Sequence, residues 1–405
     1  MPVTIAALLQ TLLLFTSKPE IAFDSPSYMA QANALVSTGH SLNARGEPDT
    51  VRTPGYPLFL AAFLETPFGV DGAVAMQRLL WVLIVAAVTW ATFRATRSTI
   101  GAVIAGLVTA IDLPALQAAG SVLTETLAAV TVTAAVLQAY RATMARSTTA
   151  GVIAGLLAGV AALVRPVAIL LGVAIAVAIA VTAPRQLRTR LAIAVALASL
   201  VIPAAWTARN YARTGVVTFS SISSINLLLY RAAGTLAIRD PGGMDANIQR
   251  RQSELEAAAC RAAEARFGGE CDAIPITRRA TVYSGLAMPI ILGDPVASAQ
   301  QAARAFVMIM FGGGATLLSS WTGLSESSAR MLAFAYTVPL FVLAVAGALY
   351  WWRIDRVAAA LMLLTIAYMV LMSLGVEAYS RFRVPILPLY AMLAGGGAKR
   401  ITASQ

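Results

Sequence analysis

KPEIAFDSPSYMAQANALVSTGHSLNARGEPDTVRTPGYP, residues 18–57, is the first substantial polar stretch in a chain otherwise dominated by apolar residues. It places an acidic residue, Asp24, shortly after the first apolar run, and it ends in the motif RTPGYP (52–57) just before apolar sequence resumes. We expect residues 18–72 to form an outer loop of a membrane protein that carries the reacting groups. We expect the rest of the chain to form a bundle beside this loop.

The composition is that of a membrane protein. Hydrophobic residues make up 58% and charged residues 12% of the 405 residues, about half the charged fraction of an ordinary soluble domain, which is roughly 25%. Apolar runs of about 20 residues recur along the chain, and each can cross a hydrocarbon core of about 30 Å as a helix. The sequence therefore predicts an all-α polytopic membrane protein.

About ten membrane spans are expected in this bundle. The apolar run 149–182 is too long for one helix and is interrupted by Arg165-Pro166, which predicts two short spans that meet at a polar turn. Residues 303–328 are also apolar enough to span, but an interfacial or re-entrant segment fits the charge pattern better. The predicted spans are 1–17, 73–93, 99–115, 119–140, the two halves of 149–182, 191–207, 330–352, 357–375 and 384–398.

The basic residues orient the bundle, because cytoplasmic loops of membrane proteins carry an excess of lysine and arginine. The ten-span arrangement leaves every acidic residue except Asp355 on the opposite, outer side. We therefore interpret the formal charge of +11 as an orientation signal and not as a nucleic-acid-binding patch. The cations that share the predicted cytoplasmic side are Arg94, Arg97, Arg141, Arg146, Arg185, Arg188, Arg190, Arg353, Arg356, Lys399 and Arg400.

Three regions follow from this arrangement. Residues 1–207 are expected to form an N-terminal transmembrane module with the catalytic first loop. Residues 208–328 form an extracytoplasmic and interfacial segment with a helix around 246–268, where arginine, glutamate and alanine are frequent. Residues 329–405 form the C-terminal spans.

Cys260 and Cys271 both fall in the longest polar segment. A disulfide between them is permitted if that segment lies outside the cytoplasm. The sequence shows no Ser/His/Asp set, no glycine-rich phosphate loop after a strand and no CxxC motif.

Two carboxylates are candidates for chemistry. Asp24 could take a proton from an acceptor hydroxyl or hold a divalent cation, although the following Ser-Pro also suits a helix N-cap. Glu125, in SVLTETLAAV, lies at the outer end of a span, where an ionisable group either faces a cavity or reaches back to water. His40, the only histidine, could join them as a metal ligand or could be a solvated loop residue. A divalent metal on Asp24, Glu125 and His40 stays open.

Arginines recur at the same predicted outer face. A guanidinium binds phosphate oxygens with paired donors, and several at headgroup depth suit a phosphate or pyrophosphate whose tail lies in the bilayer. Each alone could anchor a lipid headgroup, whereas their recurrence favours one shared anionic ligand. These residues are Arg52, Arg165, Arg209, Arg381 and Arg383.

These landmarks, taken in order, resemble those of bacterial GT-C glycosyltransferases, the membrane enzymes akin to aminoarabinose transferases and protein O-mannosyltransferases. Many relatives carry Asp-Glu in the first loop, whereas here Ser25 follows Asp24. The resemblance covers most of the chain. It is carried by Asp24 with Tyr28, RTPGYPLFLA (52–61), LTETL (123–127), LVRPVAIL (163–170), WTARNYARTG (206–215) and YSRFRVPILPLYAMLA (379–394).

The resemblance implies a GT-C-like helix bundle in the bacterial inner membrane. Its activity would be inverting transfer of a sugar from a polyprenyl-phosphate donor to a glycan, lipid or protein acceptor on the extracytoplasmic face. Asp24 maps to the catalytic acid of the first loop and Glu125 to an acidic position facing the same cavity, while residues 208–302 would recognise the acceptor. Cationic side chains would neutralise the departing lipid phosphate. The residues assigned to that phosphate are Arg52, Tyr56, Arg165, Arg209, Asn210, Arg381 and Arg383.

Two other classes of function compete with this hypothesis. A lipid-linked saccharide transporter or flippase would also need arginines for phosphate, but it predicts polar residues through the middle of the spans, whereas here the ionisable residues gather at outer ends. A structural scaffold of the cell envelope would leave Asp24 and the arginines unexplained. Membrane lipids are expected partners in every case, and nucleic acid in none.

Overall fold

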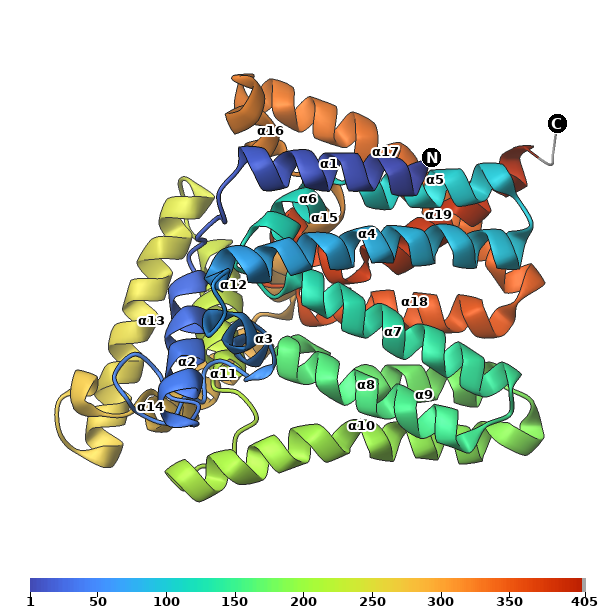
Figure 1. The fold of residues 1–405 in the computed structure, drawn as a ribbon. Coiled ribbons are helices and arrows are strands. Elements are labelled where there is room, and N and C mark those ends of the chain that lie inside the picture. Colours follow the sequence, from blue (N-terminus) through green and yellow to red (C-terminus); the bar gives the residue numbers. More distant parts are fainter. Residues whose placement is uncertain (403–405) are drawn as a thin grey trace.

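The computed structural model describes residues 1–402, which fold into the predicted all-helical bundle (Figure 1). Within these residues no strand forms, only isolated bridges at Glu20 with Ser121 and at Leu42 with Pro48. The helices of the bundle are α1 (Pro2–Thr16), α4 (Gly69–Thr96), α5 (Thr99–Ile111), α6 (Leu113–Gly120), α7 (Glu125–Met144), α8 (Thr148–Val164), α9 (Leu171–Thr182), α10 (Arg185–Thr214), α17 (Glu326–Ile354), α18 (Arg356–Met372) and α19 (Leu387–Thr402).

The remaining elements form the polar segments at one end of the bundle and the link back to it. The first polar segment holds α2 (Ser25–Thr38) and α3 (Gly55–Leu64). The other elements are η1 (Pro166–Ala168), α11 (Ile222–Asn226), η2 (Leu227–Ala232), α12 (Ala233–Ala237), α13 (Met244–Phe267), η3 (Cys271–Ala273), α14 (Ile276–Gly293), α15 (Pro295–Phe311), α16 (Ala315–Thr322) and η4 (Ser380–Ile386).

The predicted spans coincide with helices, but the number that cross the membrane stays a prediction. Among the described residues, three helices, α4, α10 and α17, are long and apolar enough to cross alone. The count rises to five if each of the bent pairs α5–α6 and α14–α15 is one span. Large apolar side chains such as Leu197 on α10 and Val342 on α17 are 63% and 58% exposed, which suits contact with lipid and not with water.

Two breaks interrupt helices of the bundle, one at a proline and one at an aspartate. The predicted interruption at Arg165-Pro166 is confirmed, since α8 ends at Val164 and Arg165 is extended, as a residue before proline prefers. A second break differs from the predicted spans 99–115 and 119–140. Here α5 ends at Ile111, and the Asp112 side chain caps α6 by accepting a hydrogen bond from the backbone N–H of Ala115 at 3.2 Å. The pair α5–α6 is consequently bent by 51°.

The predicted basic loops lie together at one end of the bundle. The turns α4–α5, α7–α8, α9–α10 and α17–α18 share that end with the C-terminal part of α19 (Figure 1). Lys399 donates a hydrogen bond to the backbone oxygen of Thr96, and the Tyr140 hydroxyl donates to Asp355 at 2.7 Å, so these turns are joined to one another. We call this the basic end.

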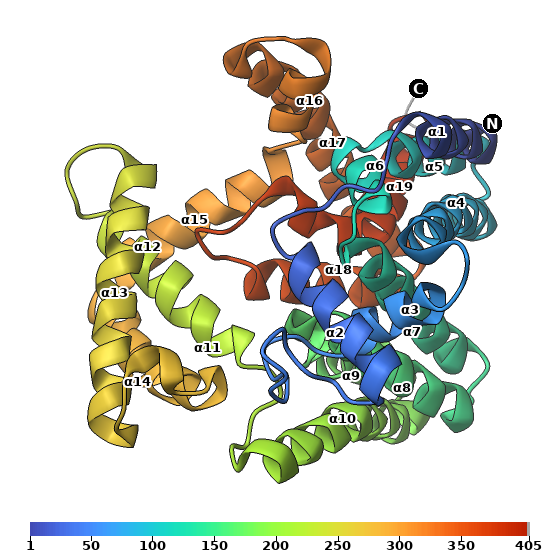
Figure 2. The same ribbon diagram turned by 60° about the vertical axis from the view of Figure 1, so that its left-hand side comes forward.

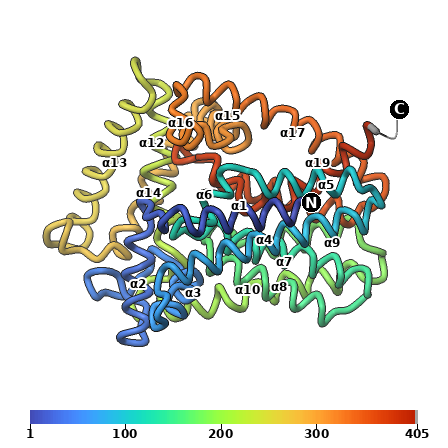
Figure 3. The backbone as a smooth tube through the Cα atoms, turned by 45° about the horizontal axis from the view of Figure 1, so that its top comes forward, coloured from blue at the N-terminus to red at the C-terminus, as the bar shows by residue number. Residues whose placement is uncertain are grey.

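The polar segments lie at the opposite end. Figure 3 shows α2, α3, α13 and α14 gathered there, and Figure 2 shows α13 and α14 to one side of the bundle. The predicted helix around 246–268 is confirmed as α13. A disulfide joins Cys260 on α13 to Cys271 in η3. The division into 1–207, 208–328 and 329–405 stays a prediction, and residues 403–405 of the last region lie outside the described part of the chain.

Close approach of small residues holds the last spans together. Gly347 of α17 lies against the backbone of α19, and a Cβ atom at this position would stand only 1.7 Å from the carbonyl oxygen of Leu393. Such contacts are typical of membrane helices, which associate through tight packing because lipid is as apolar as their side chains. This contact fixes the position of α19, the helix that directly follows η4 and its arginines.

We therefore expect Gly347→Ala to destabilise the protein by about 1–3 kcal/mol, the usual cost of overpacking a filled contact. Gly285→Ala in α14 is the matched control, because a Cβ there meets nothing within 4 Å. The control should be neutral or stabilise by about 0.5–1 kcal/mol, since alanine favours helix more than glycine does. Thermal unfolding of both variants in detergent tests this, and equal midpoints would contradict the packing role of Gly347.

Candidate active site

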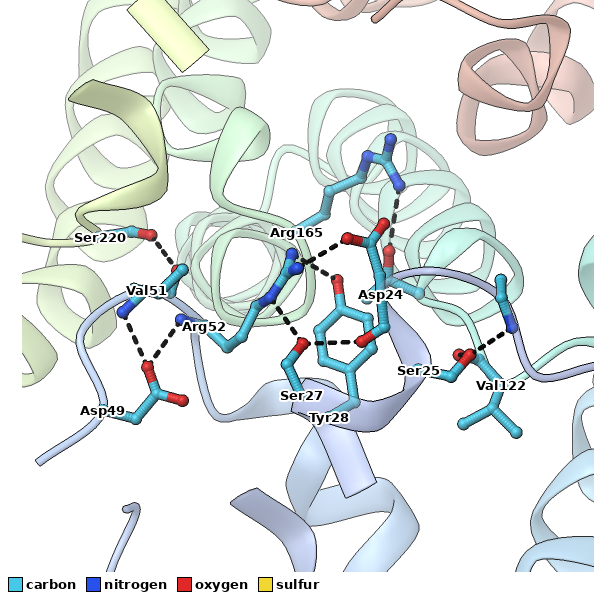
Figure 4. A network of polar contacts seen from close by, with 12 residues as sticks. Asp24, Ser25, Ser27, Tyr28, Asp49, Val51, Arg52, Val122, Arg165 and Ser220 are labelled. Carbon is cyan, nitrogen blue, oxygen red and sulfur yellow. Dashed lines mark hydrogen bonds and ion pairs between the residues drawn. The ribbon is translucent and has the colours of Figure 1, made fainter. Parts of the chain in front are cut away.

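The first polar segment aims Asp24 into the molecule. Asp24 precedes α2, yet its side chain forms no capping hydrogen bond. One carboxylate oxygen instead meets Arg52 Nη2 at 2.6 Å (Figure 4). The other meets Arg381 Nη2 at 3.3 Å. The alternative of a helix cap is therefore not what the structure shows, and Asp24 is left as a carboxylate held by two cations from distant parts of the chain.

The RTPGYP motif explains how Arg52 reaches Asp24. The Asp49 carboxylate accepts hydrogen bonds from the backbone N–H groups of Val51 and Arg52 at 2.8 and 3.0 Å, which fixes the turn before the motif (Figure 4). The Arg52 guanidinium also donates to Ser27 Oγ at 3.0 Å and lies over the ring of Tyr28, 4.8 Å from its centre. Together these contacts hold the Arg52 side chain in one orientation.

The start of α3 brings this turn against α8. A Cβ atom at Gly55 would stand 2.6 Å from the backbone of Leu163, so only glycine permits the approach. Leu163 lies two residues before Arg165, the residue that directly follows α8. The close contact at Gly55 therefore brings the Arg52 turn and Arg165 to the same region.

Glu125 opens α7 and is the second buried acid of the site, with 2% of its side chain exposed. Its Oε1 atom meets Arg165 Nη1 at 2.9 Å and Arg381 Nε at 3.8 Å. Arg165 also donates to Thr124 Oγ1 at 3.0 Å and lies over the ring of Phe382, 4.9 Å from its centre. The guanidinium of Arg381 therefore lies between the two carboxylates and contacts both.

These five charged side chains, which we call the charge cluster, line a cavity of about 1230 Å³. Three guanidiniums face two carboxylates, which leaves one excess positive charge. The rest of the wall adds three arginines, Arg231, Arg304 and Arg330, and two acids, Asp245 and Glu377, so the excess stays positive. A cavity of this size and sign suits an anion that carries an organic group. The charge cluster consists of Asp24, Arg52, Glu125, Arg165 and Arg381.

The arginines determine the protonation of Asp24. Burial alone would raise the pKa of this carboxyl, but Arg52, Arg381 and Arg165 outweigh burial and hold the pKa below its ordinary value. Asp24 is therefore ionised at neutral pH. The same cations make it a weak base as long as they stay beside it.

The landmark WTARNYARTG has a structural role at the end of α10. Arg209 donates to the backbone oxygens of Ser41 at 2.7 Å and Asp49 at 3.2 Å, while the buried Asn210 side chain donates to the carbonyl of Thr218 at 2.9 Å. Neither residue lines the cavity. The structure thus does not bring them to the other predicted phosphate residues. Arg209 joins α10 to the first polar segment, and Asn210 joins it to the residues that follow α10.

Tyr56 is also placed differently from the expectation. Its side chain is fully buried, its hydroxyl donates to Gln77 at 2.8 Å, and its ring packs edge-on against Tyr28 with 5.2 Å between the ring centres. It does not line the cavity. Tyr56 supports Tyr28, which does line it, and has no free hydrogen-bonding group for a ligand.

Arg383 also lies away from the cavity wall. Its side chain is 0% exposed and pairs with the buried Asp112 at 2.5 Å, and it donates to the backbone oxygen of Met310 at 2.7 Å. It therefore cannot hold a phosphate as expected from its position beside Phe382 and Arg381. In the 3-10 helix η4, residues two apart project in different directions, about 120° from each other. Arg381 therefore lines the cavity, while Arg383 joins η4 to the α5–α6 bend and to α15.

The predicted metal ligands do not assemble. His40 is exposed and lies outside the cavity wall, and among the described residues no group of three His, Cys, Asp or Glu side chains could hold a metal ion. The carboxylates of Asp24 and Glu125 are already paired with guanidiniums, whose charge repels a cation. The donor set present here does not fit a divalent metal.

Sequence reasoning missed Glu377, which lies between α18 and η4 and also lines the cavity. Burial raises the pKa of this carboxyl to about 7, an effect that a hydrogen bond from its own backbone N–H and the charges of Arg231 and Arg165 only partly offset. The available signal was an acid directly after the predicted span 357–375, the same pattern that singled out Glu125. Tyr230 of η2, on the facing wall, was missed as well.

The fold is similar to that of a known class of protein. Solved structures of the oligosaccharyltransferase AglB, a GT-C membrane glycosyltransferase, share this bundle of apolar helices. The resemblance found in the sequence is thereby confirmed, since both a family model and solved structures lead to the same group.

The particular relatives are distant. Residues 51–207 match the family model of dolichyl-phosphate-mannose-protein mannosyltransferase. The oligosaccharyltransferase AglB from Archaeoglobus fulgidus, in complex with an inhibitory peptide and a dolichol-phosphate, superposes with a TM-score of 0.54 at 15% identity, covering 97% of this chain and 49% of AglB. AglB in complex with zinc and sulfate gives 0.55 at 15% identity, covering 97% and 48%. The chain thus spans about half the length of AglB.

ArnT from Cupriavidus metallidurans bound to undecaprenyl phosphate superposes with a TM-score of 0.46 at 14% identity, covering 100% of this chain and 78% of ArnT. No curated protein matches the sequence.

The two C-terminal arginines should respond differently to substitution. Arg383→Ala leaves Asp112 buried without its partner, which costs about 3–5 kcal/mol, whereas Arg381 is partly exposed and its loss should change stability little. The double variant Arg383→Met with Asp112→Leu should regain much of the loss, because no unpaired charge remains. Thermal unfolding in detergent measures all three. Similar destabilisation by Arg381→Ala and Arg383→Ala would contradict the assignment.

Proposed function

We propose that this protein is an inverting glycosyltransferase that moves a sugar from a polyprenyl-phosphate donor to an acceptor hydroxyl at the charge cluster. The observation that carries the proposal is that Arg381 contacts both Asp24 and Glu125 at the wall of one large basic cavity. The family model matched by residues 51–207 is named for a dolichyl-phosphate sugar, and the AglB and ArnT structures hold dolichol-phosphate and undecaprenyl phosphate. A lipid phosphate is the ligand that these neighbours suggest.

The reaction uses Asp24 as the proton acceptor. The acceptor oxygen attacks the anomeric carbon from the face opposite the phosphate, the bond between that carbon and the phosphate oxygen breaks, and its electron pair leaves with the lipid phosphate. The acceptor proton passes to Asp24. Configuration at the anomeric carbon inverts because bond formation and bond breakage occur on opposite faces. The guanidiniums of Arg165 and Arg381 stabilise the negative charge that grows on the phosphate.

Donor binding would also activate Asp24. Before the donor arrives, Arg381 and Arg165 are paired with the two acids and keep the pKa of Asp24 low. A phosphate that draws these guanidiniums toward itself removes part of their effect on Asp24. The pKa of Asp24 then rises, and the carboxylate becomes a better base only when a donor is present. This coupling would limit proton transfer in the absence of a substrate.

The position of the cavity supports an extracytoplasmic reaction. The helices α7, α8 and α18 each have one terminus in the cavity wall, at Glu125, Val164 and Met372, and the other terminus at the basic end. Basic turns mark the cytoplasmic side of a membrane protein. We infer from this arrangement that the cavity opens on the outer face, where a lipid-linked sugar would reach it along the apolar wall that includes Val167, Ile169 and Phe334.

Asp24→Asn should abolish sugar transfer, because the amide cannot accept the proton, while the variant still binds undecaprenyl phosphate. The measurement is transfer from an undecaprenyl-phosphate sugar by purified protein in lipid nanodiscs. Glu65→Gln is the matched control, since Glu65 is an exposed acid of the same polar segment at the end of α3, and its activity should stay at the wild-type level. Unchanged turnover in Asp24→Asn would remove Asp24 from its role.

Arg165→Ala and Arg381→Ala should weaken binding of undecaprenyl phosphate by roughly 1.5–3 kcal/mol, or about 10- to 150-fold in Kd, the cost of losing a charge-assisted contact. Arg209→Ala is the control, because its donors are occupied outside the cavity. Binding is measured by titration of the lipid onto protein in nanodiscs. An equal loss in Arg209→Ala, or none in the other two, would refute the phosphate site.

A further inference from the structure

Glu377 is a buried acid that the reaction described above does not use. It lies in residues 373–379, between α18 and η4, and its side chain lines the cavity. Its Oε2 atom is buried and has no hydrogen-bond partner among the described residues. The costs of burying a carboxyl group without a partner are large enough that such groups normally find one. A ligand from outside the chain would supply the missing hydrogen bond to Oε2.

The chain is shaped to hold the Glu377 carboxyl in this position. A Cβ atom at Gly375 would stand 1.9 Å from Oε2 and 2.5 Å from Oε1 of Glu377, so the carboxyl group lies directly on the glycine. A Cβ atom at Gly234 of α12 would in turn stand 2.2 Å from Val376. Two glycines therefore let residues 375–377 pack into the space between the charge cluster and α12.

The position of Glu377 relates it to both reacting groups. Arg381 follows it by four residues, and the charges of Arg165 and Arg231 act on its carboxyl group. Tyr230 is in the range of both Glu377 and Asp24, whose charges each raise the pKa of its hydroxyl after the larger effect of burial. Glu377 and Tyr230 thus lie near the groups proposed to hold the phosphate and to accept the proton. The part of the donor between those two points is the sugar.

We propose that Glu377, supported by Tyr230, binds hydroxyl groups of the transferred sugar and determines which sugar is accepted. This inference rests on the proposed function. A carboxyl group accepts hydrogen bonds from two neighbouring hydroxyls, and a phenol adds one donor and one acceptor. The phosphate is the wrong partner for Glu377, since like charges repel. A sugar is neutral and is not repelled by the carboxyl group. Its hydroxyls can donate hydrogen bonds to the Oε2 atom, which has no partner in the protein.

The test compares one lipid with and without its sugar. Wild-type protein, Glu377→Gln and Gly375→Ala are titrated in nanodiscs with undecaprenyl phosphate and with a panel of undecaprenyl-phosphate hexoses and pentoses. Gly375→Ala keeps the acid but pushes it from its place, and the backbone at Gly375 has no positive φ that alanine would strain. Glu65→Gln and Gly285→Ala are the matched controls, because each makes the same chemical change away from the cavity.

We expect both test variants to weaken binding of the best sugar-bearing lipid about tenfold, the effect of losing roughly one hydrogen bond to a charged group. Binding of undecaprenyl phosphate should change less than twofold, and the preference among sugars should narrow. Glu377→Gln should unfold at no lower temperature than the wild type, since the amide removes a buried unpaired acid. A residue with only a structural role would show the reverse, lower stability with unchanged sugar preference.

Two results overturn the inference. If binding of both kinds of lipid were weakened equally, Glu377 would act on the phosphate or on folding. If binding of both were unchanged, Glu377 would have no role in the donor site. A wild-type protein that binds neither lipid would instead refute the proposed function, and the sugar site with it. The sugar-free lipid therefore separates the two failures.

Discussion

The candidate site depends on one guanidinium that two carboxylates share. Arg381 comes from the C-terminal part of the chain, Asp24 from its first polar segment and Glu125 from the start of a central helix, and their contacts of 3.3 and 3.8 Å join these three parts. In a cavity of low dielectric, such pairs are strong only if their geometry is fixed. Several surrounding contacts hold this geometry in place. Asp49 stabilises the turn before Arg52, Pro166 ends α8 so that Arg165 is extended, and Arg383 fixes η4 to the α5–α6 bend.

The sequence predicted most of the fold because hydrophobic length is a strong signal in a membrane protein. Apolar runs, the Arg165-Pro166 interruption and the clustering of basic turns all follow from the cost of exposing polar groups to lipid. Boundaries were less predictable where a short polar residue could end a helix. The break at Asp112 lies inside an apolar run, and nothing local shows that this acid is paired with an arginine 271 residues away.

The candidate site was only partly predictable, because an arginine near a span end looks the same whatever it pairs with. Arg381 and Arg383 are two residues apart in one motif, yet one faces the cavity and the other is 0% exposed against Asp112. Arg209 uses its donors on backbone carbonyls of the first polar segment. Glu377 was missed because its distinguishing feature, the glycine on which its carboxyl lies, depends on the folded loop.

The charges of the cluster explain why these five side chains suit the proposed reaction. Arg52, Arg165 and Arg381 exceed Asp24 and Glu125 by one positive charge, and a polyprenyl-phosphate sugar, a phosphodiester, carries one negative charge. The sum of these five side chains and the donor is then zero. After transfer, the lipid phosphate carries close to two negative charges, but Asp24 has gained a proton, so the sum is again close to zero. A cavity that excludes water favours such a path, because a net charge there would have no solvent to stabilise it.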